Sequence, residues 1–475
     1  MEYKWTVLSN TTLGTLMSSL DSNIVLIALP TIASELKGMT TLDVLWTILG
    51  YQLVVATVLV NFGRLADMFG RVRLYNMGFA IFTIGSGLCS ISQSPMELIS
   101  FRVVQAIGAG FLFSNSAAII TDTFPPSERG SALGINQISI VVGSVTGLIA
   151  GGVLTSTLGW RSIFWVNLPI GIFATLWAHL KLKELSLPTK TRYLDITGNV
   201  VFASALVILL LAITLEAISG LPLIVTAVML SVSFVMLVSF VLIENRAKDP
   251  MFDLSIFRSR EFDSGNITIF LNALSRGSFI LVMVFFLQGP LVGFDPLQAG
   301  LFLIPMSISL SVFGPVSGVL SDHLGQRPFV ILGLLVSSAG FLIMTMIPAE
   351  VSFTRLLLPL VLIGSGMGIF ASPNRASIMN SVPSQRRGIA SGISTTLTNV
   401  GNTVSIGLAF LIMSTQTSRS TLDRIFSGLS ATGTSFSAGS FLDSMHLVFF
   451  ISAALLVFSV FFYVFGFSKM RMSRP

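Results

Sequence analysis

The stretch GRLADMFGRVRL at residues 63–74 sets the fold, because the chain carries its pattern twice. Gly-x-Leu-x-Asp-x-x-Gly occupies residues 63–70 and returns at residues 318–325, an offset of 255 positions. In each copy the pattern follows one long apolar run and precedes another. The same short polar link therefore joins two apolar segments in both halves of the sequence.

The apolar runs around these links belong to a chain that is apolar throughout. Of its 475 residues, 53% are hydrophobic and only 10% are charged, and the mean hydropathy is +0.86. A soluble protein of this length has about 25% charged residues. So few charges cannot cover a surface that faces water, so the chain is expected to lie in lipid. Continuous rather than alternating apolar runs exclude a membrane β-barrel.

The thickness of the bilayer sets the length of a transmembrane helix. A hydrocarbon core of about 30 Å needs about 20 mostly apolar residues per helix. This measure predicts fourteen transmembrane helices, and twelve remains the alternative. The predicted ranges are 6–32, 43–63, 74–92, 96–120, 132–156, 161–181, 196–217, 221–243, 263–288, 297–320, 328–347, 354–376, 388–414 and 442–466.

Basic residues orient these helices. Of the 27 Lys and Arg residues, Arg102 and Arg276 fall inside spans, and twenty of the others fall in links on one side. Lys and Arg collect in cytoplasmic loops. We therefore predict that both termini are cytoplasmic, which requires an even number of helices. The five basic residues assigned to the outer side are Lys37, Arg161, Arg355, Arg419 and Arg424.

Two further motifs repeat at nearly the same spacing. Ile-Gly-x-Gly at 107–110 returns at 363–366, and Pro-Ser-x-Arg at 126–129 returns at 383–386. Three motifs that keep one spacing indicate an internal duplication. Because the two copies keep the same orientation, they are parallel repeats related by an axis along the membrane normal.

The repeat spacing divides the chain into six, two and six helices. We predict an N-terminal six-helix bundle over 1–182, a linker with two inserted helices over 183–250, and a C-terminal six-helix bundle over 251–475. The linker at 182–195 is basic, and the outer loop at 415–441 is rich in Ser, Thr and Gly. Two pseudo-symmetric bundles can rock around a site at the membrane midplane, as secondary transporters do.

The repeated links are predicted to act as a cytoplasmic gate. Glycines permit a sharp turn and a close backbone approach, and a carboxylate can pair with a nearby Arg or helix N-terminus. The alternative is an ordinary short Gly/Arg loop. The predicted gate residues are Gly63, Asp67, Gly70, Arg71, Asp322 and Arg327.

These features together resemble the major facilitator superfamily, and within it the fourteen-helix drug:proton antiporters. The resemblance covers nearly the whole chain, and it implies the major facilitator fold and multidrug efflux. Beyond the repeated link, it is carried by LDSNIVLIALPTI (20–32), FRVVQAIGAG (101–110), GWRSIFWVNLPIG (159–171), RYLDITG (192–198) and the long outer loop before the last helix.

Asp21 and Arg102 are the candidate residues for proton coupling. A carboxyl inside a span is costly and suggests a function, here the uptake and release of a proton; the alternative is a structural hydrogen bond. The family resemblance implies that Arg102 holds a nearby carboxyl ionised until the proton arrives. The alternative for Arg102 is a side chain that reaches to the membrane interface.

The fifth span carries Gly134, Gly143, Gly147, Gly151 and Gly152, and the last four lie on one face. Glycines at i, i+4 and i+8 form a groove that lets another helix pack closely. In the signature of the antiporter family, a Pro follows the third glycine. The third glycine of this chain is Gly147, and Leu148 follows it. This departure leaves the helix kink and the direction of transport open.

Arg276 lies near the centre of the ninth span. Either it contacts substrate, or it pairs with backbone carbonyls or Glu216. Four other charged residues lie at cytoplasmic helix ends: Glu128, Arg129, Arg386 and Arg387. They either form ion pairs between the two halves or simply face water. The candidates for a substrate cavity are Gln105, Asn136, Asn272, Arg276 and Asn374.

The sequence thus predicts a proton-coupled exporter of small amphipathic compounds, multi-pass in the plasma membrane and monomeric. Its expected partners are a small-molecule substrate, protons and the lipid bilayer, not nucleic acid. Because it lacks a phosphate-binding loop, clustered catalytic residues and grouped metal ligands, we expect no enzyme activity, cofactor or metal. The alternative is a transporter of the same fold that exports or imports a specific metabolite or organic anion.

Overall fold

The computed structural model describes residues 2–125, 128–185, 195–247, 250, 252, 254–383, 386–426 and 438–468. Much of the predicted linker at 182–195 and of the outer loop at 415–441 lies outside these residues, as do 126, 127 and 384 of the repeated Pro-Ser motif. Six of the bases assigned to the cytoplasmic side also lie outside them: Lys190, Arg192, Lys248, Lys469, Arg471 and Arg474.

Within the described residues, fourteen helices are long and apolar enough to cross a membrane, which confirms the predicted number. Two of these spans are each built from two helices. The helices are α1 (Tyr3–Glu35), α2 (Thr41–Phe69), α3 (Arg71–Ile91), α4 (Pro95–Thr123), α5 (Arg129–Leu158), α6 (Ser162–Trp165) with α7 (Asn167–Lys181), α8 (Ile196–Ser219), α9 (Leu223–Arg246), α10 (Arg260–Arg276) with α11 (Phe279–Gln288), α12 (Pro296–Leu324), α13 (Gln326–Met344), α14 (Phe353–Asn380), α15 (Arg387–Gln416) and α17 (Ala438–Ser468).

The helix boundaries have local causes. At the start of α2, the Thr40 side chain accepts a bond from the Asp43 N–H while the Asp43 carboxylate accepts from the Thr40 N–H. This capping box satisfies donors that the first turn leaves unpaired. The repeated links turn on Gly70 and Gly325, whose φ angles are 106° and 87°. Only glycine adopts such angles without strain, so each link needs a single residue between its two helices.

Two spans predicted as continuous helices are interrupted. α6 and α7 are separated at Val166, because Pro169 has no N–H to donate to the carbonyl of Trp165. α10 and α11 are separated at Gly277 and Ser278, where the Ser278 N–H donates to Ser405 Oγ at 3.0 Å. Two short elements were not predicted: a 3₁₀ helix, η1 (Leu254–Arg258), and α16 (Arg419–Phe426) in the outer loop.

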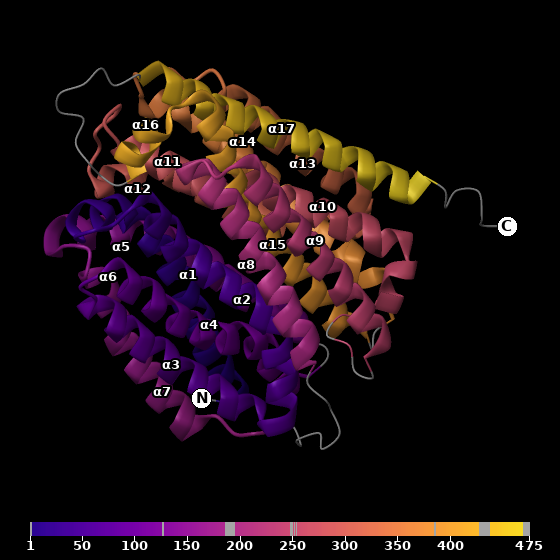
Figure 1. Ribbon diagram of the computed structural model, residues 1–475. Helices are drawn as coiled ribbons and strands as arrows, with labels where there is room; N and C mark the ends of the chain where they lie inside the picture. Colours follow the sequence, from indigo (N-terminus) through magenta and orange to yellow (C-terminus); the bar gives the residue numbers. More distant parts are fainter. Residues whose placement is uncertain are drawn as a thin grey trace.

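The helices form two groups that meet along one side (Figure 1). α1–α7 make the first group and α10–α17 the second, and α8 lies beside α2 and α15 between them. α1 begins and α17 ends at the same end of the bundle, which we call the terminal end. The opposite end, where α5 ends, α12 begins, and α6, α11 and α16 lie, is the far end.

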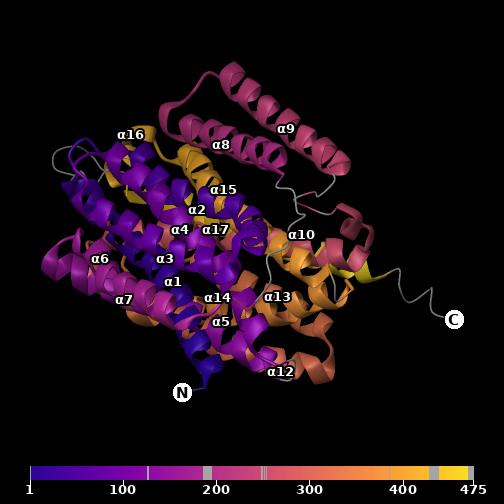
Figure 2. The same ribbon diagram turned by 90° about the horizontal axis from the view of Figure 1, so that it is seen from below.

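The two inserted helices lie outside both groups. Figure 2 shows α9 as the outermost helix, with α8 between it and the rest of the bundle. Large apolar side chains cover α9 and are exposed, among them Leu223, Ile224 and Phe234. An exposed apolar helix surface of this length is suited to lipid rather than to water.

The largest buried apolar cluster joins the two groups. It combines Leu20, Ile24 and Ile27 of α1 with Phe285 of α11 and Leu303 of α12. A second cluster, which includes Tyr75 and Phe82 of α3, belongs to the first group alone. The halves therefore share a core toward the far end.

Candidate functional site

Asp21 and Arg102 form an ion pair in the interior of the first half. Arg102 Nη1 donates to Asp21 Oδ2 at 2.6 Å. The Asp21 side chain is 0% exposed and that of Arg102 is 2% exposed. The interfacial position considered for Arg102 is therefore wrong, because this side chain ends on a buried carboxylate and not at the membrane surface.

Two amide side chains complete this site, which we call the Asp21 cluster (Asp21, Arg102, Gln105 and Asn167). Gln105 Nε2 and Asn167 Nδ2 each donate to Asp21 Oδ1 at 2.8 Å. Gln105 Oε1 in turn accepts from Arg102 Nη1 at 2.7 Å. The carboxylate thus has three donors from α4 and α7, which is what a buried charge requires.

Aromatic and hydroxyl groups surround the cluster. The Arg102 guanidinium lies 4.1 Å from the centroid of the Tyr51 ring in α2, a cation–π contact. Asn167 Nδ2 also donates to Ser86 Oγ of α3 at 3.1 Å. α1, α2, α3, α4 and α7 therefore all contribute to the cluster. Since Asp21, Gln105 and Asn167 are fully buried, none of them meets solvent in this state.

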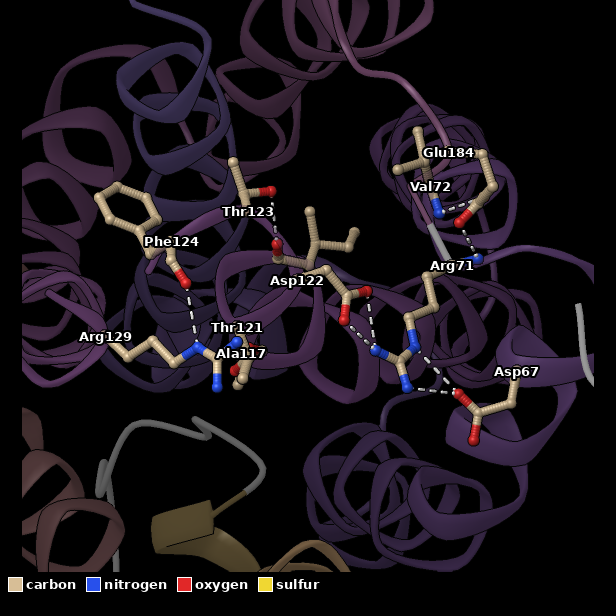
Figure 3. Close-up of polar contacts among 11 residues, drawn as sticks. Asp67, Arg71, Val72, Ala117, Thr121, Asp122, Thr123, Phe124, Arg129 and Glu184 are labelled. Atoms are coloured by element: carbon tan, nitrogen blue, oxygen red, sulfur yellow. Dashed lines mark hydrogen bonds and ion pairs between the residues drawn. The ribbon is translucent and has the colours of Figure 1, made fainter. Parts of the chain in front are cut away.

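A second polar network lies at the terminal end, and we call it the Arg71 network (Asp67, Arg71, Asp122 and Glu184). Figure 3 shows Arg71 between Asp67 and Asp122. Its guanidinium lies 2.8 Å from a carboxylate oxygen of each. Glu184 accepts bonds from the N–H groups of Arg71 and Val72 at the start of α3, where a negative charge is favoured.

The Arg71 network joins α2, α3 and α4 of the first half with Glu184 in the segment directly after α7. The Asp67–Arg71 pair agrees with the pairing considered from the sequence, while Asp122 and Glu184 were not anticipated. The second copy of the motif is built differently. Asp322 and Arg327 are exposed, and among the described residues none forms an ion pair with Asp322.

The other charged helix ends also bond within one half. Glu128 accepts from Lys4 Nζ at 2.9 Å, and Arg129 Nε donates to the Phe124 carbonyl at 3.0 Å. Arg387 Nε donates to the Met379 carbonyl at 3.1 Å. The structure therefore does not place these three residues in the inter-half pairs considered from the sequence.

The remaining cavity candidates are distributed between the two halves. Asn136 lies inside the first half and donates to Thr15 Oγ1 and Ser116 Oγ. In the second half, Asn374 donates to the Gly265 carbonyl at 3.2 Å. Asn272 accepts from Arg276 Nε at 3.2 Å. Gln105 belongs to the buried Asp21 cluster, so it does not line an open space in this state.

The pairing of Arg276 with Glu216 that we considered is wrong. Glu216 Oε1 accepts from Arg419 Nη2 at 3.2 Å, and Glu216 Oε2 accepts from Thr226. Arg276 is half-buried, and among the described residues its one hydrogen-bond partner is Asn272. A cation thus remains without a counter-charge in the middle of a span.

The glycines of α5 contact two different helices. A Cβ atom would lie 2.7 Å from the Leu16 carbonyl oxygen if added at Gly143, and 2.6 Å from that of Leu20 if added at Gly147. Gly151 likewise faces α1. Gly152 faces α12 of the other half, where an added Cβ would lie 2.6 Å from Leu297 Cα.

Contacts between the halves at the far end extend beyond Gly152. An added Cβ at Gly300 of α12 would lie 2.6 Å from the Leu148 carbonyl oxygen. Gln288 of α11 donates to the Ile27 carbonyl of α1 at 2.8 Å. The far end is therefore closed by close backbone contacts, and Leu148 takes part in them at the position where the antiporter signature has Pro.

Replacing Arg71 by Gln is expected to lower stability by about 1 kcal/mol, because two partly exposed ion pairs are lost. Transport should fall several-fold as the turn between α2 and α3 loosens. Arg73→Gln is the matched control, since Arg73 is exposed in the same turn. Thermal unfolding and transport rates measure both variants. Equal effects of the two substitutions would show that the Arg71 network has no special role.

Comparisons with known proteins agree with this architecture. A family model described as Major Facilitator Superfamily matches residues 11–256 and 265–469. "Riboflavin transporter RibZ" of Clostridioides difficile (strain 630) is 33% identical over 410 residues, which cover 86% of this chain and 88% of that protein. "Multidrug resistance protein Stp" of Mycobacterium tuberculosis (strain CDC 1551 / Oshkosh) is 32% identical over 400 residues, which cover 84% of this chain and 74% of that protein.

Solved structures share the fold at low sequence identity. A bacterial homolog of the human lysosomal transporter Spinster, in an inward-facing and unoccupied conformation, matches with a TM-score of 0.72 and 17% identity. The match covers 100% of this chain and 99% of that one. This likeness concerns the arrangement of the helices.

Proposed function

Because this chain belongs to the major facilitator superfamily, we propose that it is a proton-coupled secondary exporter of small amphipathic compounds. Family membership makes it a multi-pass membrane transporter of small molecules rather than an enzyme. The proposal adds the coupling ion, the direction of transport and the kind of substrate.

The observation that carries the proton coupling is the buried pair of Asp21 and Arg102. A charged pair sealed inside lipid-embedded helices is costly and suggests a function. Protonation of Asp21 removes one of the two charges, and Arg102 then loses its partner at 2.6 Å. Proton binding thereby changes the stability of the packing among α1, α4 and α7. In this proposal that change couples the proton to a movement of the first half.

The movement itself is alternating access. The divisions at 1–182 and 251–475 are the proposed moving halves, and 183–250 carries the inserted helices. In the present state the far end is closed through Gly152 and Gly300. Because Arg71 pairs with both Asp67 of α2 and Asp122 of α4, we propose that this pairing keeps α2, α3 and α4 together while the halves rock. This role is proposed beside the cytoplasmic gate that the repeated links predict.

The export direction requires an orientation in the membrane. We propose the plasma membrane, with both termini and the Arg71 network in the cytoplasm, because most of the Lys and Arg residues that the structure describes lie at the terminal end. The far end then faces outward. A substrate taken up from the cytoplasm or inner leaflet would leave when the contacts at Gly152 separate.

The second candidate is a transporter of one metabolite or organic anion. It is favoured by the similarity to a protein named as a riboflavin transporter and by the charge of Arg276, which has no ion-pair partner among the described residues. This candidate keeps the same fold and the same Asp21 cluster, and differs in the substrate it accepts.

Purified protein in proteoliposomes with an imposed pH gradient tests the proposal. We expect a fluorescent amphipathic compound to move against its own gradient while protons move the other way. Collapse of the pH gradient by an ionophore should stop net movement. Transport that persists after the collapse, or transport without proton flux, would contradict the coupling, and a narrow response to one metabolite would favour the second candidate.

A further inference from the structure

Arg276 has no counter-charge in the part of the chain that the structure describes. Its side chain is half-buried at the end of α10, in the middle of the ninth span. Asn272 accepts a bond from Nε, which leaves both Nη groups free to donate. A lone cation at this depth is expensive, so it points to a role other than packing.

The internal repeat shows what is missing around Arg276. Gly143 of α5 packs on Leu16 and Leu20 of α1, and Gly401 of α15 packs in the same way on Phe270 and Leu274 of α10. These contacts superimpose α1 on α10 with an offset of 254 positions. Asp21 therefore corresponds to Ser275, and Ser22 corresponds to Arg276.

The second half consequently has no carboxylate at the position of Asp21. Ser275 Oγ donates to the Ser452 carbonyl of α17 at 2.9 Å, and Ser452 Oγ donates to the Ser275 carbonyl at 2.8 Å. The neutral pair fills the place that the Asp21 cluster fills in the first half. At this depth the first half pairs the charge of Asp21 with that of Arg102, whereas Arg276 of the second half has no oppositely charged partner among the described residues.

The side of α10 that bears Arg276 is packed differently along its length. Gly265, Asn272 and Arg276 are spaced by seven and four residues, so they lie on one face of the helix. At Gly265 this face is closed by α14, since Asn374 donates to its carbonyl and Ile378 contacts it. About 16 Å further along, at 1.5 Å per residue, Arg276 is partly accessible.

From these observations we propose that Arg276 is a binding site for an anionic group of the substrate, a carboxylate or a phosphate on an apolar body. A guanidinium binds such groups through two parallel hydrogen bonds. Asn272 holds Nε, so the two Nη groups face the ligand. The inference rests on the proposed transport function, and of its two candidate substrate classes it selects organic anions.

Three probes with one fluorophore test this site: dansylglycine, its neutral methyl ester and the cation dansylcadaverine. Fluorescence titration of the purified protein measures their affinities without any gradient. We expect the native protein to bind the anion about tenfold or more tightly than the ester, the ratio that one charge-assisted contact gives. Arg276→Gln should remove this preference and leave ester binding unchanged, and Arg276→Lys should keep part of it.

The control is Arg355→Gln, which removes one positive charge from the same half at an exposed position. It should leave the preference for the anion intact. The proposal fails if the native protein binds the ester or the cation at least as well as the anion, if it binds none of the probes, or if Arg276→Gln keeps the preference. A failed site with intact pH-driven transport would leave the transport function standing, because the two measurements are separate.

Discussion

Replacing Asp21 by Asn is expected to abolish transport driven by a pH gradient, with a loss of about 100-fold or more. An amide in place of the carboxylate cannot take up and release the proton. The change also leaves Arg102 buried without a counter-charge, which costs about 3–5 kcal/mol. Proton-driven uptake into inverted vesicles measures the first effect, and thermal unfolding measures the second.

A double substitution separates the two effects of this change. Asp21→Asn combined with Arg102→Leu removes both charges from the buried site. Thermal stability should recover most of the loss, because no charge is left unpaired, while transport should stay independent of the pH gradient. If either variant keeps the native response to the pH gradient, the Asp21 cluster is a structural contact and not the proton site.

Replacing Gly152 by Leu is expected to reduce transport to less than a tenth while the protein still folds. An added Cβ would lie 2.6 Å from Leu297 Cα and 2.8 Å from the Pro296 carbonyl oxygen. Backbone atoms cannot yield as a side chain can, so the halves must separate at the far end. Overpacking of this kind costs about 1–3 kcal/mol, enough to shift the equilibrium between the two states by one to two orders of magnitude.

The shift can be followed by labelling a cysteine placed at the far end. In a background with Cys89→Ser, Gln288→Cys reports on the contact between α11 and α1, and it should react faster with maleimide when Gly152 is also changed. Gly134→Leu is the matched control in the same helix, because an added Cβ there meets no atom within 4 Å. Equal labelling rates for the two leucine variants would contradict a closed far end in this state.

Helix number and duplication could be predicted because both depend on local sequence. Apolar length determines a span, and the fourteen predicted helices are the fourteen observed. The interruption at Ser278 could not be predicted, because its N–H bonds to Ser405, 127 residues away. Glycine spacing predicted close packing of α5, but only the structure separates Gly152, which faces α12, from the three glycines that face α1.

The site was predictable in its charged members and less so in their partners. Asp21 and Arg102 stood out because charges inside spans are rare. Asn167 gave no such signal, since amides occur in many spans, and its role follows from the turn between α6 and α7 that brings it to Asp21. Likewise the motif around Arg71 indicated a turn and an ion pair, while Asp122 and Glu184 joined it only through the packing of α4 and of the segment after α7.

The sequence by itself determined that this protein is a duplicated fourteen-helix membrane transporter, because hydropathy and repeat spacing are properties of the linear chain. Only the tertiary structure decided how its charges are arranged. It enclosed Asp21 and Arg102 inside one half, paired Arg71 with Asp67 and Asp122 there, and gave Arg276 no ion-pair partner among the described residues of the other. The physical reason is that an ion pair depends on which side chains meet across helices, and two copies of one motif can have different neighbours.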